Sequence, residues 1–287
     1  MKLGISSYSL SRAIAAQEMT ILDVIEWVKK IGGEHIEIVP SGFDLNQQPE
    51  LVPAIRRKAE QVGIDISNYT VRANFVCEDV AGIKEEIERV KREVDIANAL
   101  GVKLMRHDVA SRPLEQCSIV HFLKDLPILA EACREVADYA SEFGITTSVE
   151  NHGYYMQASE RVESLIDAVG RSNFKTTLDI GNFMCVDENP IRGVSNNIGL
   201  ASMVHLKDFY LRSKHRNPGQ GWFGTAGGDY LRGAIVGQGD IDIREVLRII
   251  KASGYDGYIS IEFEGLEDCR IGTEYGFQNA KRIWDEV

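Results

Sequence analysis

Four side chains that commonly bind metal ions each stand at the end of a short apolar segment. They are Glu150 in TTSVE, Asp179 in KTTLD, His205 in ASMVH and Glu262 in YISIE. Short apolar runs of this kind are typical of buried parallel strands. If the strands close into a barrel, their carboxyl ends meet at one mouth, and residues remote in sequence can bind one cation there.

Three carboxylates and one imidazole form a ligand set that suits one divalent ion, either Mn²⁺, Mg²⁺, Co²⁺ or Zn²⁺. Such an ion polarises a sugar carbonyl and its neighbouring hydroxyl, which makes the adjacent C–H proton easier to remove. Glu150 and Glu262 are expected three strands apart around the barrel, where they can flank a substrate as acid and base. Epimerisation and aldose–ketose isomerisation both follow from this arrangement. The alternative is that all four residues are ligands without an acid or base role.

Strand-like and helix-like segments alternate along the whole chain. The clearest helix is predicted at about 79–100, where apolar residues recur every three or four positions. Thr20 and Asp242 are predicted N-caps. A doubly wound open sheet is the alternative fold, but the first strand leads into ISSYSLS and not into a glycine fingerprint. The pattern therefore predicts an α/β protein of the (β/α)8 TIM barrel type, with strands in LGISSY, HIEIVP, DISNYTV, KLMRHDV, TTSVEN, KTTLDI, SMVHLKD and YISIEFE.

The barrel is predicted to be a single domain over residues 1–287, because no Ser/Pro-rich linker or charge block divides the chain. One region is irregular. The segment at about 208–241 follows the seventh strand, is rich in glycine and is far longer than an ordinary barrel connection. We expect it to form a lid loop over the mouth.

The composition indicates which class of partner and which cellular compartment to expect. A formal net charge of −11 disfavours nucleic acid as a partner and favours a small molecule. The five cysteines include no CxxC pair, which indicates a reducing, cytoplasmic environment. No stretch approaches the ~20 apolar residues of a membrane span, so no membrane association is expected. A homo-oligomer is compatible with the sequence, which does not fix the oligomeric state.

The motifs SVENHG, TLDIGN, VHLKD and SIEFEG resemble the last four strand ends of the xylose isomerase-like TIM-barrel superfamily. That group includes sugar phosphate isomerases and epimerases, inosose dehydratase and the AP endonuclease family 2 type barrels such as endonuclease IV. The resemblance implies that Glu150, Asp179, His205 and Glu262 bind one metal. It also implies that Glu150 and Glu262 exchange the substrate proton in epimerase-like members.

Two departures from the family motifs bear on the substrate. Ketose 3-epimerases resemble DxxH at the sixth strand, whereas this chain has Asp179 followed by Asn182 at the histidine position. Asn182 can bind a hydroxyl but cannot shuttle a proton near neutrality. The three-metal cluster of endonuclease IV implies many more histidines than the six present here, so a DNA-repair nuclease is the weaker alternative.

Six rim residues are predicted to bind substrate, each with a structural alternative. His152 and Lys207 follow Glu150 and His205 by two positions and should share their direction. For the others, a rim hydrogen bond, an ion pair or a surface role is the competing interpretation. The predicted substrate contacts are His107, His152, Asn182, Lys207, Arg232 and Glu37.

Together these observations predict a divalent-metal-dependent isomerase or epimerase that acts on a sugar or sugar phosphate through an enediolate. The resemblance keeps a second hypothesis open, a dehydratase of the inosose type, in which the same enolate expels a hydroxyl. A third hypothesis is a non-catalytic sugar-binding barrel whose metal only orders the rim.

Overall fold

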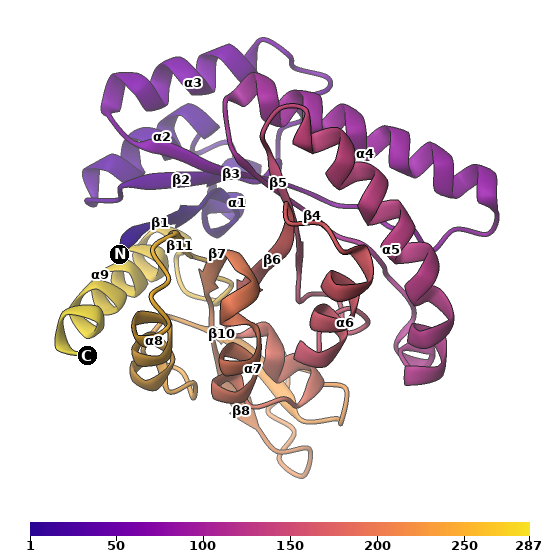
Figure 1. Ribbon diagram of the computed structural model, residues 1–287. Coiled ribbons are helices and arrows are strands. Elements are labelled where there is room, and N and C mark those ends of the chain that lie inside the picture. The colour runs from indigo at the N-terminus through magenta and orange to yellow at the C-terminus, as the bar shows by residue number, and fades with distance from the viewer.

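Eight parallel strands close into a barrel in the computed structural model, which describes residues 1–287 (Figure 1). Around the barrel the order is β1, β11, β7, β6, β5, β4, β3 and β2. Every strand overlaps one of the eight predicted segments, so the predicted (β/α)8 TIM barrel is confirmed. The barrel strands are β1 (Lys2–Ser6), β2 (His35–Ile38), β3 (Asp65–Val71), β4 (Leu104–His107), β5 (Thr146–Glu150), β6 (Phe174–Asp179), β7 (Ala201–Leu206) and β11 (Tyr258–Ile261).

Helices surround the barrel, and two of them are about twice as long as most of the others (Figure 1). These are α4 (Val80–Leu100), which matches the predicted helix, and α5 (Ile119–Ser141). The remaining helices are α1 (Ser11–Ala15), α2 (Ile21–Lys30), α3 (Leu51–Val62), α6 (Ser159–Val169), α7 (Pro190–Asn197), α8 (Ile243–Ala252) and α9 (Cys269–Glu286). Short 3-10 turns are η1 (Ser7–Leu10), η2 (Leu114–Gln116), η3 (Asn182–Val186) and η4 (Ile198–Leu200).

The helix ends follow from local sequence chemistry. Thr20 caps α2 in a reciprocal capping box with Asp23, and Asp242 caps α8 by accepting from the backbone N–H of Glu245. At the other end, Gly63 and Gly101 terminate α3 and α4 at φ angles of 70° and 81°. Glycine adopts this left-handed conformation without steric cost, so the chain turns at once toward the next strand.

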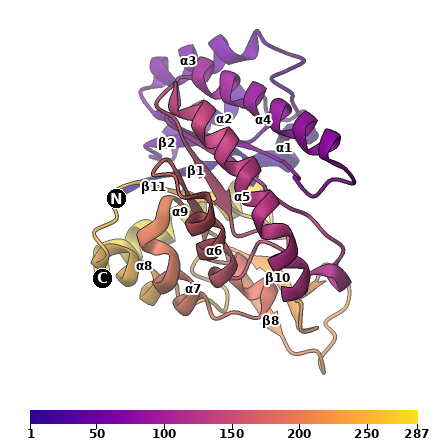
Figure 2. The same ribbon diagram turned by 45° about the vertical axis from the view of Figure 1, so that its right-hand side comes forward.

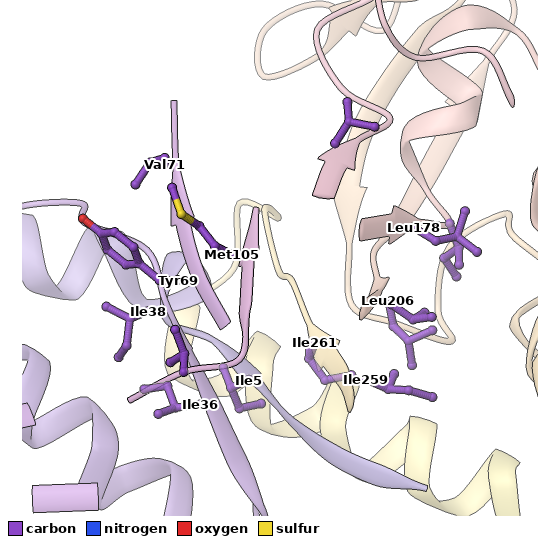
Figure 3. Packing of buried hydrophobic residues seen from close by; sticks show 14 of the residues in the cluster. Ile5, Ile36, Ile38, Tyr69, Val71, Met105, Leu178, Leu206, Ile259 and Ile261 are labelled. Atoms are coloured by element: carbon purple, nitrogen blue, oxygen red, sulfur yellow. The ribbon is translucent and has the colours of Figure 1, made fainter. Parts of the chain in front are cut away.

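The strands direct apolar side chains toward the helices and polar side chains toward the barrel axis. Because successive residues point to opposite faces, Ile36 and Ile38 pack outward while Glu37 between them points inward. Ile259 and Ile261 likewise flank the inward Ser260. Figure 3 shows this outer layer, part of a core of 71 buried residues. The apolar layer holds the barrel to its helices and leaves the interior free for polar groups.

The segment predicted as a Gly-rich lid loop at about 208–241 contains a three-stranded antiparallel sheet. Its strands are β8 (Asp208–Arg212), β9 (Phe223–Gly224) and β10 (Tyr230–Ala234), in the order β8, β10, β9. Figures 1 and 2 show β8 and β10 extending beyond the barrel. β9 is only two residues long and β10 is interrupted by Gly233, so neither has enough alternating positions to stand out in the sequence.

Asp208 joins both ends of this inserted sheet to the barrel. Its buried carboxylate accepts the backbone N–H groups of Phe209 at 2.8 Å, of Gly237 and Gly239 at 2.9 Å each, and of Ile241 at 3.3 Å. A carboxylate with several N–H donors is a strong, charge-assisted anchor. The excursion therefore leaves and re-enters the barrel at one point.

None of the helices combines the length and the apolar composition that crossing a bilayer requires. All five cysteines are free, as their spacing predicts. The compartment and the oligomeric state stay predictions.

Candidate metal centre

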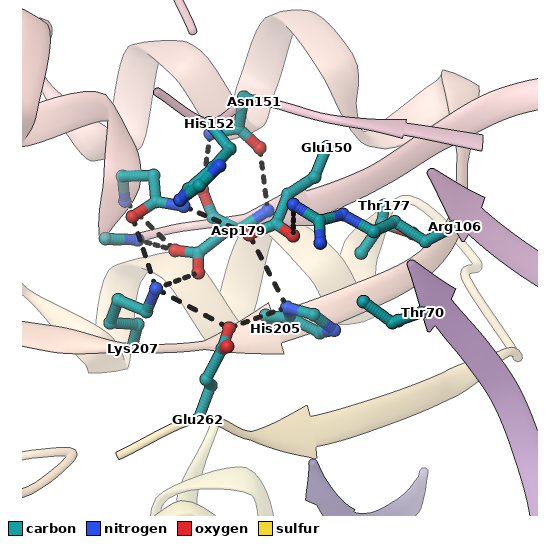
Figure 4. Close-up of polar contacts among 12 residues, drawn as sticks. Thr70, Arg106, Glu150, Asn151, His152, Thr177, Asp179, His205, Lys207 and Glu262 are labelled. Carbon is teal, nitrogen blue, oxygen red and sulfur yellow. Dashed lines mark hydrogen bonds and ion pairs between the residues drawn. The ribbon is translucent and has the colours of Figure 1, made fainter. Parts of the chain in front are cut away.

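Glu150, Asp179, His205 and Glu262 converge at the carboxyl end of the barrel (Figure 4). Barrel register produces this meeting, since Asp179 on β6 pairs with His205 on β7, and His205 pairs with Ser260, two residues before Glu262. One ligand atom from each residue lies within 4.8 Å of the others, and all four residues are buried. Two ligand atoms at ~2.1 Å on opposite sides of one ion are ~4.2 Å apart. A small contraction of the cluster from 4.8 Å would therefore bring all four ligand atoms within reach of one ion.

The donor atoms in this cluster fit a cation. Asp179 Oδ2, His205 Nδ1 and Glu262 Oε2 are buried and complete no well-aligned hydrogen bond, although each lies at ion-pair distance from another charged group of the cluster. Buried polar atoms are rarely left in this state, because each costs about 1–3 kcal/mol when unsatisfied. A divalent ion would satisfy all three at once, and three oxygen donors with one nitrogen suit Mn²⁺, Mg²⁺, Co²⁺ or Zn²⁺.

Asp179 is held rigidly so that one oxygen stays available. Its Oδ1 accepts the backbone N–H groups of Gly181 at 2.8 Å and Asn182 at 2.9 Å. Asn151 bridges to the Asp179 backbone, donating to its carbonyl at 2.7 Å and accepting its N–H at 2.8 Å. These contacts direct Oδ2 toward the other ligands.

Glu150 is fixed by a different set of partners. Arg106 Nη2 lies 2.8 Å from Glu150 Oε2, and Asn182 Nδ2 donates to Oε1 at 3.0 Å. The same Arg106 nitrogen contacts Asp108 at 2.6 Å, and His152 Nδ1 lies 3.5 Å from that Asp108 oxygen. A chain of charged groups thus runs from the ligand cluster to the rim.

Lys207 supplies positive charge on the other side of the cluster. Its buried Nζ lies 3.1 Å from Asp179 Oδ2 and 3.5 Å from both Glu262 Oε2 and Glu264 Oε2. It also donates to Asn182 Oδ1 at 3.3 Å. The ammonium group is thereby held beside two of the four ligands.

The carboxyl groups of Asp179 and Glu262 respond differently to the same buried surroundings. Burial raises the pKa of Asp179 to about 7, since attraction by Lys207 offsets it only in part and Glu150 and Glu262 add repulsion. Burial also acts to raise the pKa of Glu262, but Lys207 and His205 outweigh it and lower that pKa to about 2. A bound divalent cation would favour ionised Asp179 as well.

Glu150 and His205 carry opposite charges in the absence of a cation. Burial acts to raise the pKa of Glu150, yet Arg106 and His205 lower it to about 2. Burial acts to lower the pKa of His205, but Glu37 and Glu262 outweigh it and hold that pKa well above its ordinary value. Before a cation binds, His205 therefore carries a proton, which must leave Nδ1 for that atom to become a ligand.

A cavity of about 860 Å³ opens above these residues. Its metal side is lined by Glu150, His205, Lys207 and Glu262, while most other lining residues come from the loops of β1 to β4. Asp179 does not line the cavity. The two glutamates thus face the space that a substrate would occupy, and this volume is in the range of small-molecule sites.

Of the predicted substrate contacts, His152 and Lys207 lie on the cavity wall. The side chain of His152 is 51% exposed, and Lys207 Nζ points into the ligand cluster. Both follow their neighbouring ligand by two positions, so the alternation of strand side chains placed them correctly on the inward side.

Three other predicted contacts are buried outside the cavity lining, so their contact with substrate stays a prediction. His107 points outward from β4, with ring centroids 5.9 Å from Phe75 and 6.1 Å from Phe174. Asn182 contacts Glu150 and Lys207 as described above. Glu37 lies beside His205, with Oε2 at 2.8 Å from Nε2. Each of these polar groups is engaged by the protein itself.

Arg232 is also placed away from the cavity. It lies on β10, where its guanidinium stacks 4.8 Å from the Tyr210 ring centroid and 5.6 Å from that of Trp222. Its ion-pair distance to Glu267 is 3.9 Å. The residue packs within the inserted sheet, and its contact with substrate stays a prediction.

Arg106 and Asp108 were not among the predicted site residues, although both line the cavity. In the segment MRHDV the sequence analysis singled out His107. The two-residue alternation of a strand puts Arg106 and Asp108 on one side and His107 on the other. An arginine in line with a glutamate on the next strand was the signal that could have identified the inward side.

A family model described as "Xylose isomerase-like TIM barrel" matches residues 25–285. An inosose dehydratase of Clostridium perfringens is 22% identical over 255 residues, which cover 84% of this chain and 84% of that protein.

Two solved structures share the fold over nearly the whole chain. The probable 3-DHS dehydratase AsbF of Bacillus anthracis, involved in petrobactin synthesis, superposes with a TM-score of 0.75 at 13% identity, covering 97% of this chain and 98% of that one. A D-psicose 3-epimerase, solved in the presence of D-fructose, gives a TM-score of 0.70 at 18% identity, with coverages of 100% and 98%.

Proposed function

We propose that this chain, which belongs to the xylose isomerase-like TIM barrel family, is a divalent-metal-dependent isomerase or epimerase of a small sugar or sugar phosphate. One observation carries the proposal. Glu150 on β5 and Glu262 after β11 both face the cavity from strands separated by β6 and β7, on either side of the buried His205. Two carboxylates beside one reacting carbon can remove a proton and return it.

Glu150, Asp179, His205 and Glu262 are the residues that would hold the cation. When bound, it supplies Lewis acidity to a substrate carbonyl and the adjacent hydroxyl, favouring loss of the neighbouring C–H proton. Mn²⁺, Mg²⁺, Co²⁺ and Zn²⁺ all remain candidates, because the donor set suits each of them.

Side chains of the protein orient the base and stabilise negative charge. Arg106 and Asn182 hold both oxygens of Glu150, so its direction toward the substrate is fixed. Lys207 places a positive charge next to Glu262, where it would stabilise the negative oxygen of an enediolate. Delivery of a proton to the opposite face of the same carbon gives an epimer, and delivery to the neighbouring carbon gives an isomer.

A dehydratase is the second candidate, and the position of His152 favours it. This imidazole is half-exposed at the cavity rim and contacts Asp108, which is tied through Arg106 to Glu150. Loss of a β-hydroxyl from an enolate needs a proton donor beside the leaving oxygen, and a histidine can fill that role. The similarity to an inosose dehydratase agrees with this alternative.

The endonuclease IV-like alternative receives less support. The ligand cluster contains a single histidine, whereas the resemblance to that nuclease implies several more. The net charge of −11 also opposes approach to a phosphate backbone.

The test is incubation of the full chain with Mn²⁺ in D₂O and a panel of ketoses, aldoses and inososes. Deuterium at a carbon next to the carbonyl, located by NMR, is expected for an isomerase or epimerase. Loss of water, seen in the product mass, identifies a dehydratase. Absence of both deuterium exchange and water loss across the panel would contradict an enolising enzyme and support the non-catalytic sugar-binding hypothesis.

The acid/base role is tested by Glu150→Gln, which keeps the size of the side chain and removes its basicity. We expect turnover to fall by about 10²–10⁴-fold. Glu163→Gln, at an exposed position on α6, is the matched control and should retain wild-type turnover. Near wild-type activity of the Glu150 variant would show that another group moves the proton.

A further inference from the structure

Glu37 lies against the metal-facing histidine but outside the cavity. It is fully buried on β2, and its Oε2 is 2.8 Å from His205 Nε2 on β7, across the barrel interior. Neither atom completes a well-aligned hydrogen bond with any group, so this ion-pair contact is what each of them faces. A buried carboxylate with one unshared contact is costly unless the contact matters to the fold or the site.

The other oxygen of Glu37 is held from β3. Asn68 Nδ2 and Thr70 Oγ1 each donate to Oε1 at 2.7 Å. These two donors leave the carboxylate little freedom to rotate. They direct Oε2 at the imidazole, where it lies 2.8 Å from His205 Nε2.

The two nitrogens of His205 therefore face different surroundings. Nδ1 lies 2.9 Å from Glu262 Oε2 and 3.8 Å from Glu150 Oε1, within the ligand cluster. Nε2 faces Glu37 alone. An ionised carboxylate can only accept a hydrogen bond, and a neutral imidazole carries one N–H. Glu37 thus favours the tautomer with the proton on Nε2, which leaves the Nδ1 lone pair for a cation.

We propose that Glu37 is a positioning residue that fixes the tautomer and the ring orientation of His205, so that Nδ1 points at the metal. This inference rests on the metal site of the proposed function and replaces the predicted contact between Glu37 and substrate. Carboxylates that hold ligating histidines in this manner affect metal affinity even though they do not touch the ion.

A purely electrostatic role for Glu37 is the competing explanation. Arg106 and Lys207 add positive charge to the same interior, and any buried carboxylate would help to balance it. Glu93 provides the matched control, since it is a buried carboxylate of the cavity wall that accepts from Tyr69 at 2.7 Å and Asn46 at 3.0 Å without contacting His205.

The experiment measures Mn²⁺ affinity of the chelator-treated full chain by electron paramagnetic resonance. In Glu37→Gln, the amide presents N–H either to His205 Nε2, which favours the tautomer with the proton on Nδ1, or to Asn68 and Thr70, where donors then face each other. We expect affinity to fall by about 10–100-fold. Glu93→Gln should stay within about twofold of wild type, because its partners do not include a ligand.

A second readout reports the tautomer directly. In the Zn²⁺-saturated wild type labelled with ¹⁵N-histidine, NMR should show His205 protonated at Nε2 and not at Nδ1. Thr70→Val removes one donor from Glu37 and should weaken Mn²⁺ binding by a few-fold, less than Glu37→Gln. If thermal melting shows that Glu37→Gln does not fold, Thr70→Val is used for the affinity measurement instead.

The outcomes separate this inference from the proposed function. A wild-type chain that binds no Mn²⁺ overturns the metal site itself. A wild-type chain that binds Mn²⁺ while both the Glu37 and Thr70 variants bind equally well overturns only the positioning role. Equal weakening by Glu37→Gln and Glu93→Gln would also overturn it, because the effect would then be one of charge.

Discussion

Two buried histidines at opposite ends of the same barrel carry opposite charge preferences. His35 begins β2 at the amino end, where Nδ1 lies 2.9 Å from Ser67 Oγ and Nε2 lies 3.0 Å from the Ile259 carbonyl oxygen. Burial lowers its pKa to about 4. His205 is equally buried at the carboxyl end, but Glu37 and Glu262 hold its pKa well above the ordinary value.

The contrast shows that the partners of a buried histidine decide whether it is charged. Around His35, the Ile259 carbonyl and the charges of Glu37 and Glu34 offset only part of the cost of burying a charge, so His35 stays neutral. Carboxylates offset that cost around His205. One end of the barrel is therefore a packed structural layer, and the other is a charged site that can exchange a proton for a cation.

The largest expected effect is a difference in Mn²⁺ affinity between a variant of His205 and a variant of His35. His205→Gln should lose more than the ~10–100-fold in Mn²⁺ affinity that is typical of outer partners, because it removes a ligand. His35→Gln should bind Mn²⁺ within about twofold of wild type. Titration of both chelator-treated variants measures this difference, and equal affinities would remove the distinction between the two ends.

A steric test addresses the amino end alone. Gly4 on β1 packs so closely on His35 that a Cβ at this position would lie 2.6 Å from the imidazole Cδ2. Gly4→Ala should lower the free energy of unfolding by about 1–3 kcal/mol, since the crowded layer must shift. Urea denaturation of wild type and Gly4→Ala measures this difference in the free energy of unfolding. An unchanged unfolding free energy would mean that His35 is not tightly packed.

The pH dependence of stability should report the neutral histidines. The folded pKa of His35 and that of His107 are each lowered to about 4 by burial, below the ~6.5 of an unfolded histidine. Unfolding then takes up protons, so stability is complete above pH ~6.5 and falls by about 1.4 kcal/mol per pH unit and histidine toward pH ~4.

Urea melts of metal-free wild type and His35→Asn across this window provide the measurement. The variant should lose the part of the slope that His35 contributes, while other titrating groups cancel in the comparison. His205 adds no slope in this window, because its raised folded pKa leaves it protonated in both states below pH ~6.5. Identical slopes would show that His35 is charged in the folded chain.

The smallest expected effect concerns a single hydrogen bond. Ser67→Ala removes the hydroxyl partner of His35 Nδ1, so the free energy of unfolding should fall by about 0.5–1.5 kcal/mol with Mn²⁺ affinity unchanged. Chemical denaturation and metal titration on the same preparation give both numbers. A change in Mn²⁺ affinity would indicate that the two ends are coupled.

The fold was predictable from sequence because its signals are local and repeated. Each barrel strand is a short apolar run, and caps such as Thr20 and Asp242 mark helix starts in two or three residues. The inserted sheet was not predictable, because β9 is two residues long and its partner β10 contains Gly233. Such strands form through tertiary contacts that no local pattern records.

The ligand cluster was predictable for a geometric reason, and the substrate contacts were not. Glu150 and Asp179 end their strands, so the barrel mouth collects them whatever the packing. Whether Glu37 faces a substrate or His205 depends on which side chains fill the interior beside it. That choice is made by residues on β3 and β7, far from Glu37 in the chain.

The Asp208 anchor determines where the chain can tolerate insertions and deletions. Departure and return of the excursion share a single carboxylate, so its two chain connections to the barrel meet at one place, and its outer part rests on neighbouring loops through Tyr154 and Asp187. Lengthening, trimming or exchanging the distal hairpin would leave the eight-stranded scaffold in register. Diversification of such a graft is a route by which one catalytic mouth could acquire new specificities.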